Sequence, residues 1–93
     1  MEGICETYQE LLYANPDNCH LHNNVAVCLI SQGKFGDARR EFELALQSPG
    51  NEELYATPRS NLEALDQWIA LKEEAQARGE EDTLPQVKTQ IMY

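Results

Sequence analysis

The sequence predicts an all-α fold of antiparallel helix-turn-helix repeats, an α-solenoid fragment that ends in a longer C-terminal helix. Three observations support this prediction. Apolar residues recur at helical spacing, and nothing alternates with the period of two that is typical of a strand. Short breakers with proline or glycine divide the chain into helix-sized segments. Finally, Tyr8, Leu11 and Leu12 reappear 34 positions later as Phe42, Ala45 and Leu46.

The first two predicted helices lie on either side of the breaker at residues 15–18. Pro16 disfavours helix in the residue before it, so the first helix, from Glu2, ends near Ala14. Asp17 and Asn18 then offer caps for a second helix, which runs from about Asn18 to Gln32. Gly33 supplies the left-handed residue with which many helices end. The second helix is therefore expected to stop there.

A third and a fourth helix follow. The apolar stripe of the third begins at Phe35, and residues 48–51 terminate it. Thr57 and Pro58 resemble an N-cap followed by proline at the first helical position, which opens a longer helix that ends at Gly79. Residues 80–82 are acidic and read as a solvated linker. The tail from Leu84 to Tyr93 is expected to form at most one weak helical turn around Val87 and Ile91.

Composition and charge exclude several classes of partner. The chain has 93 residues, so it forms at most one domain, whose core is limited unless a partner extends it. Its net charge of −9 would repel nucleic acid and anionic lipid. No apolar run is long enough for membrane insertion, and the acidic N-terminus does not resemble a signal peptide, which indicates a cytoplasmic location. Three cysteines, Cys5, Cys19 and Cys28, are an odd number and are expected to be free thiols.

The recurrence at 34 positions is typical of a helical repeat. The chain resembles the tetratricopeptide repeat (TPR) family, whose units carry a small residue in the first helix and an A-x₃-F pattern, followed by alanine, in the second. Small residues allow two helices to approach closely, and the aromatic ring fills the space beside them. The matching structural positions are Ala26, Gly33 in the turn, Ala38, Phe42 and Ala45.

The resemblance divides residues 1–79 into three units. Residues 2–18 match the second helix of an incomplete repeat, residues 19–50 a full repeat, and residues 51–79 a degenerate repeat or a capping helix, with 80–93 as linker and tail. The chain also resembles, more narrowly, the C-terminal repeat region of the trafficking protein particle complex subunit 12 family, on the run Asn23 to Leu29 with Gly33, Glu43, Pro49 and residues 61–62. That resemblance implies a scaffold in vesicle tethering.

Chemical motifs are weak by comparison. Cys19, His20 and His22, with Cys28 nearby, offer soft ligands, but the paired spacing of structural zinc sites is missing. A Cys19–His22 nucleophile pair would need an orienting group and an oxyanion site that the sequence does not indicate. The five glycines form no phosphate-binding cluster. No catalytic residue, metal or cofactor is therefore expected.

Surface recognition is the remaining function. In the TPR family, an asparagine at the sixth position of a first helix often holds the backbone of an extended peptide, and Asn24 matches that position. An amide donates and accepts together, so it suits a backbone of any sequence. The alternative is that Asn23 and Asn24 face solvent or cap the adjacent loop. Val27 lies where a second polar contact would be, which disfavours a carboxylate clamp, although Arg59 offers one positive contact.

The sequence thus predicts a non-enzymatic scaffold for protein–protein interaction, with a standalone peptide-binding adaptor as the alternative. Its partners are other helical-repeat subunits or an extended peptide. The helix over Glu2 to Ala14 lacks the helix that would precede it in a repeat array, so one apolar flank is left uncovered. We therefore also expect self-association through this helix.

Overall fold

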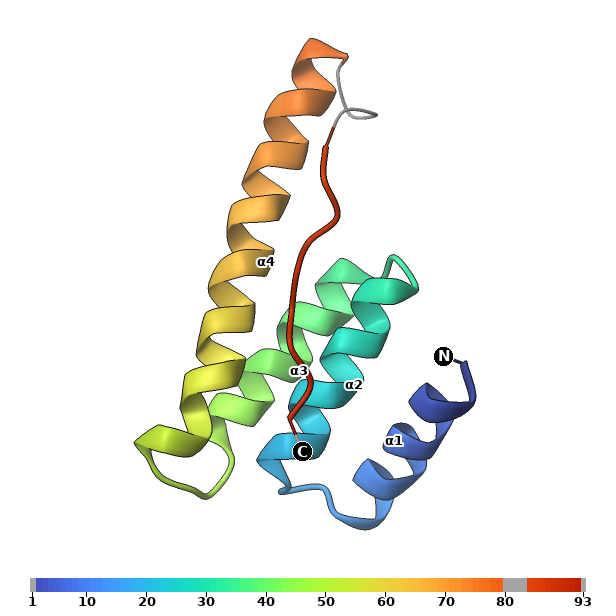
Figure 1. Cartoon of the computed structure of the whole chain (residues 1–93), viewed down its shortest axis with the longest axis vertical. Coiled ribbons are helices and arrows are strands. Elements are labelled where there is room, and N and C mark those ends of the chain that lie inside the picture. The colour runs from blue at the N-terminus through green and yellow to red at the C-terminus, as the bar shows by residue number, and fades with distance from the viewer. Residues whose placement is uncertain (1, 80–83, 93) are drawn as a thin grey trace.

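Four helices make up the regular secondary structure, and the all-α prediction is confirmed. The computed structural model describes residues 2–79 and 84–92, and within them it contains no strand. The helices are α1 (Glu2–Ala14), α2 (Cys19–Ser31), α3 (Phe35–Gln47) and α4 (Glu52–Arg78). Consecutive helices run in opposite directions, and α4 extends well beyond the other three (Figure 1). The helix α2 packs against each of the others.

The breakers act at the predicted places for the first three helices. The side chain of Asn18 caps α2 by accepting a hydrogen bond from the Leu21 N–H at 3.0 Å. Gly33 follows Gln32, the C-cap of α2, and adopts a φ of 77°, in the left-handed region that glycine occupies without steric cost. The helix α3 ends at Gln47, one residue before the predicted breaker. Local capping chemistry therefore sets these boundaries.

The predicted start of the fourth helix is wrong. Helix α4 begins at Glu52, six residues before Pro58, and Pro58 is a buried residue inside it. Asn51 is the N-cap, because its side-chain oxygen accepts a hydrogen bond from the Leu54 N–H at 3.1 Å. Glu52 in the first turn also interacts favourably with the positive end of the helix dipole. This cap defines the start more strongly than Thr57 does.

Proline inside α4 removes a hydrogen bond, and α2 supplies a replacement. Pro58 has no N–H, so the Leu54 carbonyl four residues earlier lacks its helical donor. The buried thiol of Cys19 donates to that carbonyl, with 3.9 Å between sulfur and oxygen. The long distance is typical of a weak sulfur donor. The pair connects the first turn of α2 to the first turns of α4.

The core lies where α2, α3 and α4 meet. The side chains of Ala26 on α2 and Ala38 on α3 are completely buried, in one cluster with Phe42 of α3 and Leu65 of α4. Ala45 is also fully buried. Small side chains let the axes of α2 and α3 approach, and the Phe42 ring fills the space beside them. Ala26 and Ala38 are therefore both buried where α2 and α3 pack together.

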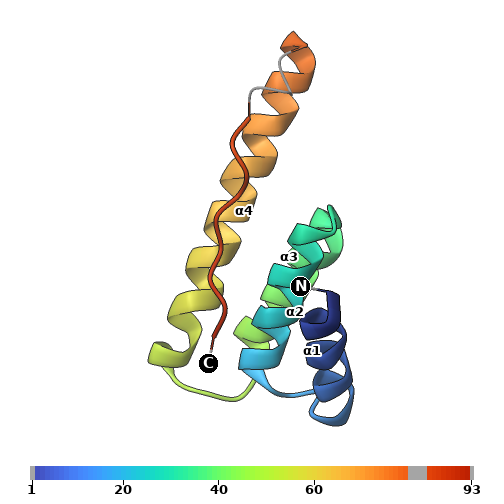
Figure 2. The same ribbon diagram turned by 45° about the vertical axis from the view of Figure 1, so that its right-hand side comes forward.

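The tail does not form the expected helical turn. Residues 84–92 contain no helix and run as an extended segment beside α4 toward the start of α2 (Figures 1 and 2). Tail backbone groups bond to side chains of both helices, so a helical turn would have to give up these external bonds. The predicted acidic linker at 80–82 lies outside the described residues.

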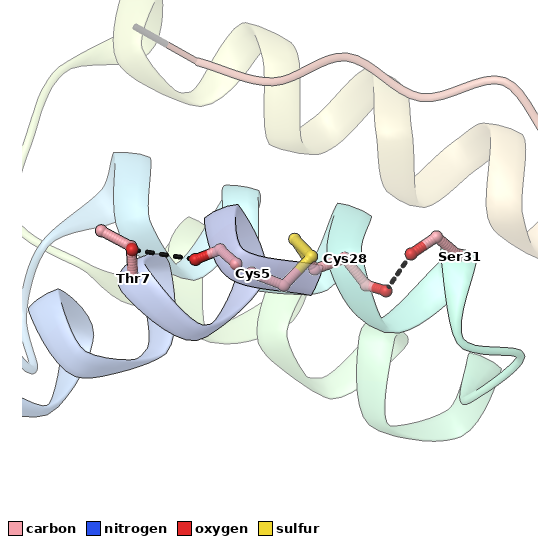
Figure 3. The surroundings of a disulfide bond; sticks show 5 residues. Cys5, Thr7, Cys28 and Ser31 are labelled. Atoms are coloured by element: carbon pink, nitrogen blue, oxygen red, sulfur yellow. Dashed lines mark hydrogen bonds between the residues drawn. A yellow bond between two sulfur atoms is a disulfide. The ribbon is translucent and has the colours of Figure 1, made fainter. Parts of the chain in front are cut away.

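The cysteines also differ from the expectation of three free thiols. Cys5 of α1 and Cys28 of α2 form a disulfide, with 5.6 Å between their Cα atoms (Figure 3). The antiparallel pairing of α1 and α2 brings these buried residues together, although 23 positions separate them in sequence. Only Cys19 is a free cysteine among the described residues. Disulfides are rare in the cytosol, so this pair argues against the cytoplasmic location, which remains a prediction from the sequence.

None of the helices in the two described ranges combines the length and the apolar character needed to span a bilayer.

Candidate functional site

Three asparagines on two helices contact the tail, and they form the centre of the candidate site. Asn23 and Asn24 are neighbours on α2, and Asn61 lies on α4. Figures 1 and 2 both show the tail running alongside these two helices, opposite in direction to each. All three asparagines are at most 3% exposed. A buried amide needs hydrogen-bond partners, and the tail backbone provides many of them.

Two of the asparagines each bind one tail residue through both of its backbone groups. Asn24 accepts the Met92 N–H and donates to the Met92 carbonyl, both at 2.7 Å. Asn61 accepts the Gln90 N–H at 3.0 Å and donates to the Gln90 carbonyl at 2.8 Å. In an extended chain, backbone groups of residues two apart point to the same side. The two amides therefore act as a neighbouring strand would.

Asn23 holds the other two asparagines in position. Its amide nitrogen donates to the Gln90 carbonyl at 3.0 Å and to the Asn24 side-chain oxygen at 3.2 Å. Its own side-chain oxygen accepts a hydrogen bond from Asn61 at 2.8 Å. Each buried amide thus donates and accepts within one network, and no buried side-chain polar atom of the described residues lacks a partner. This network fixes the orientation of all three side chains.

The tail presents alternate side chains to the helices. Val87, Thr89 and Ile91 are partly buried, whereas Lys88 and Gln90 between them are exposed. This alternation is the period of an extended strand. We call the surface of α2 and α4 that holds the tail, centred on Asn23, Asn24 and Asn61, the groove. It contacts the tail in two ways, through the backbone groups of residues 90 and 92 and through side chains at every second position.

A partly open pocket continues the groove toward the start of the tail. It has a volume of about 610 Å³, and its walls include Val27 and Ile30 of α2, Phe35 of α3 and Trp68 of α4. Tail residues 86–89 line its remaining side. The indole N–H of Trp68 donates to the Pro85 carbonyl at 2.7 Å. This bond holds the tail at a second place, separate from the asparagines.

An aromatic pair supports this pocket. The rings of Phe35 and Trp68 lie 4.6 Å apart between centroids, which is within the range of favourable aromatic contacts. The ammonium group of Lys72 lies 5.1 Å from the Phe35 ring centroid and 5.3 Å from that of Trp68. A cation at this distance is attracted to the faces of both rings. Nearby, Arg39 of α3 pairs with Asp66 of α4 at 2.8 Å, joining the same two helices.

The structure brings together three of the four predicted binding residues. Asn23 and Asn24 bond to the tail, and Val27 lines the adjoining pocket. The two asparagines neither face solvent nor cap a loop. Arg59 lies apart from them and forms an exposed ion pair with Glu52 at 3.3 Å. Asn61 was missed as a binding residue because the helical spacing within α4 does not show which residues of α2 it meets. The sequence also does not indicate the contact of Trp68 with the tail, since an indole at helical spacing is most often a packing residue.

The histidine and cysteine cluster has structural partners. One ring nitrogen of His22 contacts the Glu41 carboxylate at 2.8 Å and the other contacts the Pro16 carbonyl at 2.6 Å. Cys28 is in the disulfide, and burial raises the pKa of the Cys19 thiol. The described residues contain no group of three side chains arranged to bind a metal ion. The side-chain groups that bond to the tail are thus the uncharged amides of the three asparagines and the indole of Trp68.

Amide side chains of this kind bind a backbone reversibly and without regard to its side chains.

Comparisons of the chain with protein-family models, with curated proteins and with solved structures found no match.

Proposed function

We propose that this chain is a non-enzymatic protein-interaction module whose groove between α2 and α4 binds an extended peptide. The observation that carries the proposal is the double pairing of Asn24 and Asn61 with the backbone of an extended segment. A peptide from another protein offers the same N–H and C=O groups at the same spacing. Main-chain bonds of this kind provide affinity, and pockets for alternate side chains provide specificity.

The repeat interpretation supports this role. We infer that α2 and α3 correspond to a full TPR-like unit over residues 19–50, with α1 as the second helix of an incomplete unit. Burial of Ala26, Ala38 and Phe42 in one cluster is consistent with the small and aromatic positions of such a unit. In that arrangement Asn24 lies on the first helix, where TPR proteins hold peptides. The resemblance and the groove thus point to the same helix face.

The general scaffold role that the sequence favours remains a second candidate because of α1. Its side chains Ile4 and Leu11 lie on one face and are 51% and 46% exposed, so an apolar surface is available to another protein. Association with other helical-repeat subunits, including those of a vesicle-tethering complex, would use this surface. The groove is the better supported site, since it already shows complementary contacts with an extended chain.

The groove can be tested by selecting peptides from a phage library of random dodecamers against the full chain and against its Gln90→Pro/Met92→Pro variant. The variant lacks the two tail N–H groups that Asn61 and Asn24 accept. We expect selected peptides to perturb the side-chain amide NMR signals of Asn23, Asn24 and Asn61, and to lose binding in an added Asn24→Ala substitution. A matched Gln67→Ala substitution at an exposed position of α4 should leave binding unchanged. The proposal fails if neither protein yields peptides whose binding depends on Asn24.

A further inference from the structure

We propose that the segment Leu84 to Met92 is the built-in ligand of this groove, and that a partner peptide binds only by displacing it. This inference rests on the proposed function, because it assigns to the peptide site its resident competitor. It also defines the chemistry of a partner able to compete.

The contacts of the tail are those that a separate peptide would make. Asn24 and Asn61 together form four hydrogen bonds with the tail, all of them to main-chain atoms of Gln90 and Met92. The Trp68 bond also goes to a main-chain atom, the carbonyl of Pro85. None of these contacts depends on the identity of a tail side chain. A peptide of different sequence can therefore replace the tail bond for bond.

The buried asparagines explain why the groove needs an occupant. Removing the tail takes two partners from Asn24 and two from Asn61, and these amides are 3% exposed while the tail is in place. Unpaired buried amides are costly, so an empty groove would have to admit water or a new ligand. The tail or a partner satisfies the same atoms. Binding of one therefore excludes the other.

Covalent attachment favours the tail over a free competitor. The tail belongs to the same chain as α4, so its binding to the groove is intramolecular, and a free peptide must compete with the effective concentration of the tail. A partner sees only the fraction of molecules whose groove is open, and its apparent affinity falls by that fraction. A competitor must therefore bind the open groove tightly or be present at high local concentration.

The tail also indicates what a competitor looks like. It needs free N–H groups at two positions separated by one residue, so proline is excluded at both. Alternate positions facing the helices suit β-branched side chains such as those of Val87, Thr89 and Ile91. Lys88 is the one charged residue in the described tail, and the chain as a whole carries a net charge of −9. The partner is thus an extended, neutral or basic segment.

The test uses a fluorescent synthetic peptide of residues 84–93 and three full-length proteins: the parent chain, the Gln90→Pro/Met92→Pro variant and the Gln67→Ala variant. The double variant should release the tail. Gln67→Ala is the control because Gln67 is exposed on α4 and is not among the residues that line the pocket. By fluorescence anisotropy we expect the peptide to bind the double variant at least ~10-fold more tightly than the parent or the control.

Two further measurements test whether the tail occupies the groove. Trp68, the single tryptophan of the chain, should shift its emission in the double variant and recover when the peptide is added. In the parent chain, hydrogen exchange should be slower at the Gln90 and Met92 amides than at the Lys88 amide. Equal peptide binding by parent and double variant, no binding to the double variant, or unprotected amides at residues 90 and 92 would each overturn the inference. If random peptides still bind in an Asn24-dependent manner, the groove function survives and only the role of the tail is lost.

Discussion

Asn24 on α2 and Asn61 on α4 bind tail residues only two positions apart, and Asn23 bonds to both of their side chains. The asparagines thus connect two helices that are distant in sequence and at the same time hold an extended segment. Stability and recognition depend on the same amides at this point of the fold.

Replacing Asn61 by leucine should destabilise the chain. The substitution keeps a similar size but leaves the buried oxygen of Asn23 without its donor at 2.8 Å. The cost of such an unsatisfied group is about 1–3 kcal/mol in the free energy of unfolding, measured by urea denaturation. Gln67→Leu, at an exposed position of the same helix, should change it by less than about 0.5 kcal/mol. Equal stability of the two variants would show that the network contributes little.

Ala38→Leu tests the close approach of α2 and α3. The side chain of Ala38 is 0% exposed beside Ala26 and Phe42, so three additional carbons have no free space. Overpacking should lower the free energy of unfolding by about 1–3 kcal/mol. The control is Ala70→Leu, which makes the same chemical change at an exposed position of α4. A urea midpoint of Ala38→Leu equal to that of the parent would contradict the tight crossing.

Reduction of the Cys5–Cys28 disulfide should destabilise the fold. The bond closes a loop with a sequence separation of 23 residues, for which chain entropy in the unfolded state predicts about 3 kcal/mol. Denaturation with and without dithiothreitol measures the difference. In Cys5→Ser the reductant should have no further effect on the midpoint. A parent chain with the same midpoint under both conditions would mean that the bond does not form or does not constrain the unfolded chain.

The thiol of Cys19 should react slowly with Ellman's reagent in the native chain and rapidly in urea. Burial raises its pKa, so less of the reactive thiolate is present at a given pH. The same pKa shift makes the free energy of unfolding depend on pH. The folded chain holds this proton to higher pH than the unfolded chain does. The stability that Cys19 contributes is therefore fully present below the usual thiol pKa and is lost as the pH rises through the raised pKa. Rapid native labelling at neutral pH would show that the site opens readily.

Self-association through α1 is expected for the isolated chain. Ile4 and Leu11 lie seven residues apart on one helix face and are 51% and 46% exposed. Burying about 200 Å² of apolar surface contributes about 5 kcal/mol before ordering costs, while the net charge of −9 opposes random aggregation. Sedimentation velocity at several concentrations should show a defined dimer that Leu11→Lys weakens. A monomer at every concentration would assign this face another role or none.

The sequence predicted the features that depend on local chemistry. Asn18, Gly33 and the breaker after Gln47 act through capping and left-handed backbone, which involve only near neighbours in the chain. The start of α4 was placed wrongly because Thr57 and Pro58 form a plausible helix start. Asn51, followed by two glutamates, forms a better one.

The other differences between the sequence predictions and the structure depend on contacts between distant parts of the chain. Cys5 meets Cys28 only after α1 and α2 pack together, so an odd number of cysteines does not reveal the pair. The tail carried a signal that was missed, because Val87, Thr89 and Ile91 are β-branched residues at every second position. Asn23 and Asn24 were recognised through the TPR resemblance. Their partner Asn61 could be identified only from the packing of α4 against α2.

The contact between Cys19 and Leu54 makes positions 19 and 58 interdependent, although they lie on different helices. A proline at position 58 creates the need for an external donor, and an alanine at position 19 would remove the donor that meets it. A double-mutant cycle of Cys19→Ala and Pro58→Ala should therefore give a non-zero coupling energy. Over evolutionary time, substitutions at these two positions should be correlated. A proline at position 58 should occur together with a hydrogen-bond donor such as cysteine, serine or threonine at position 19. Where position 58 is not proline, position 19 should vary more freely.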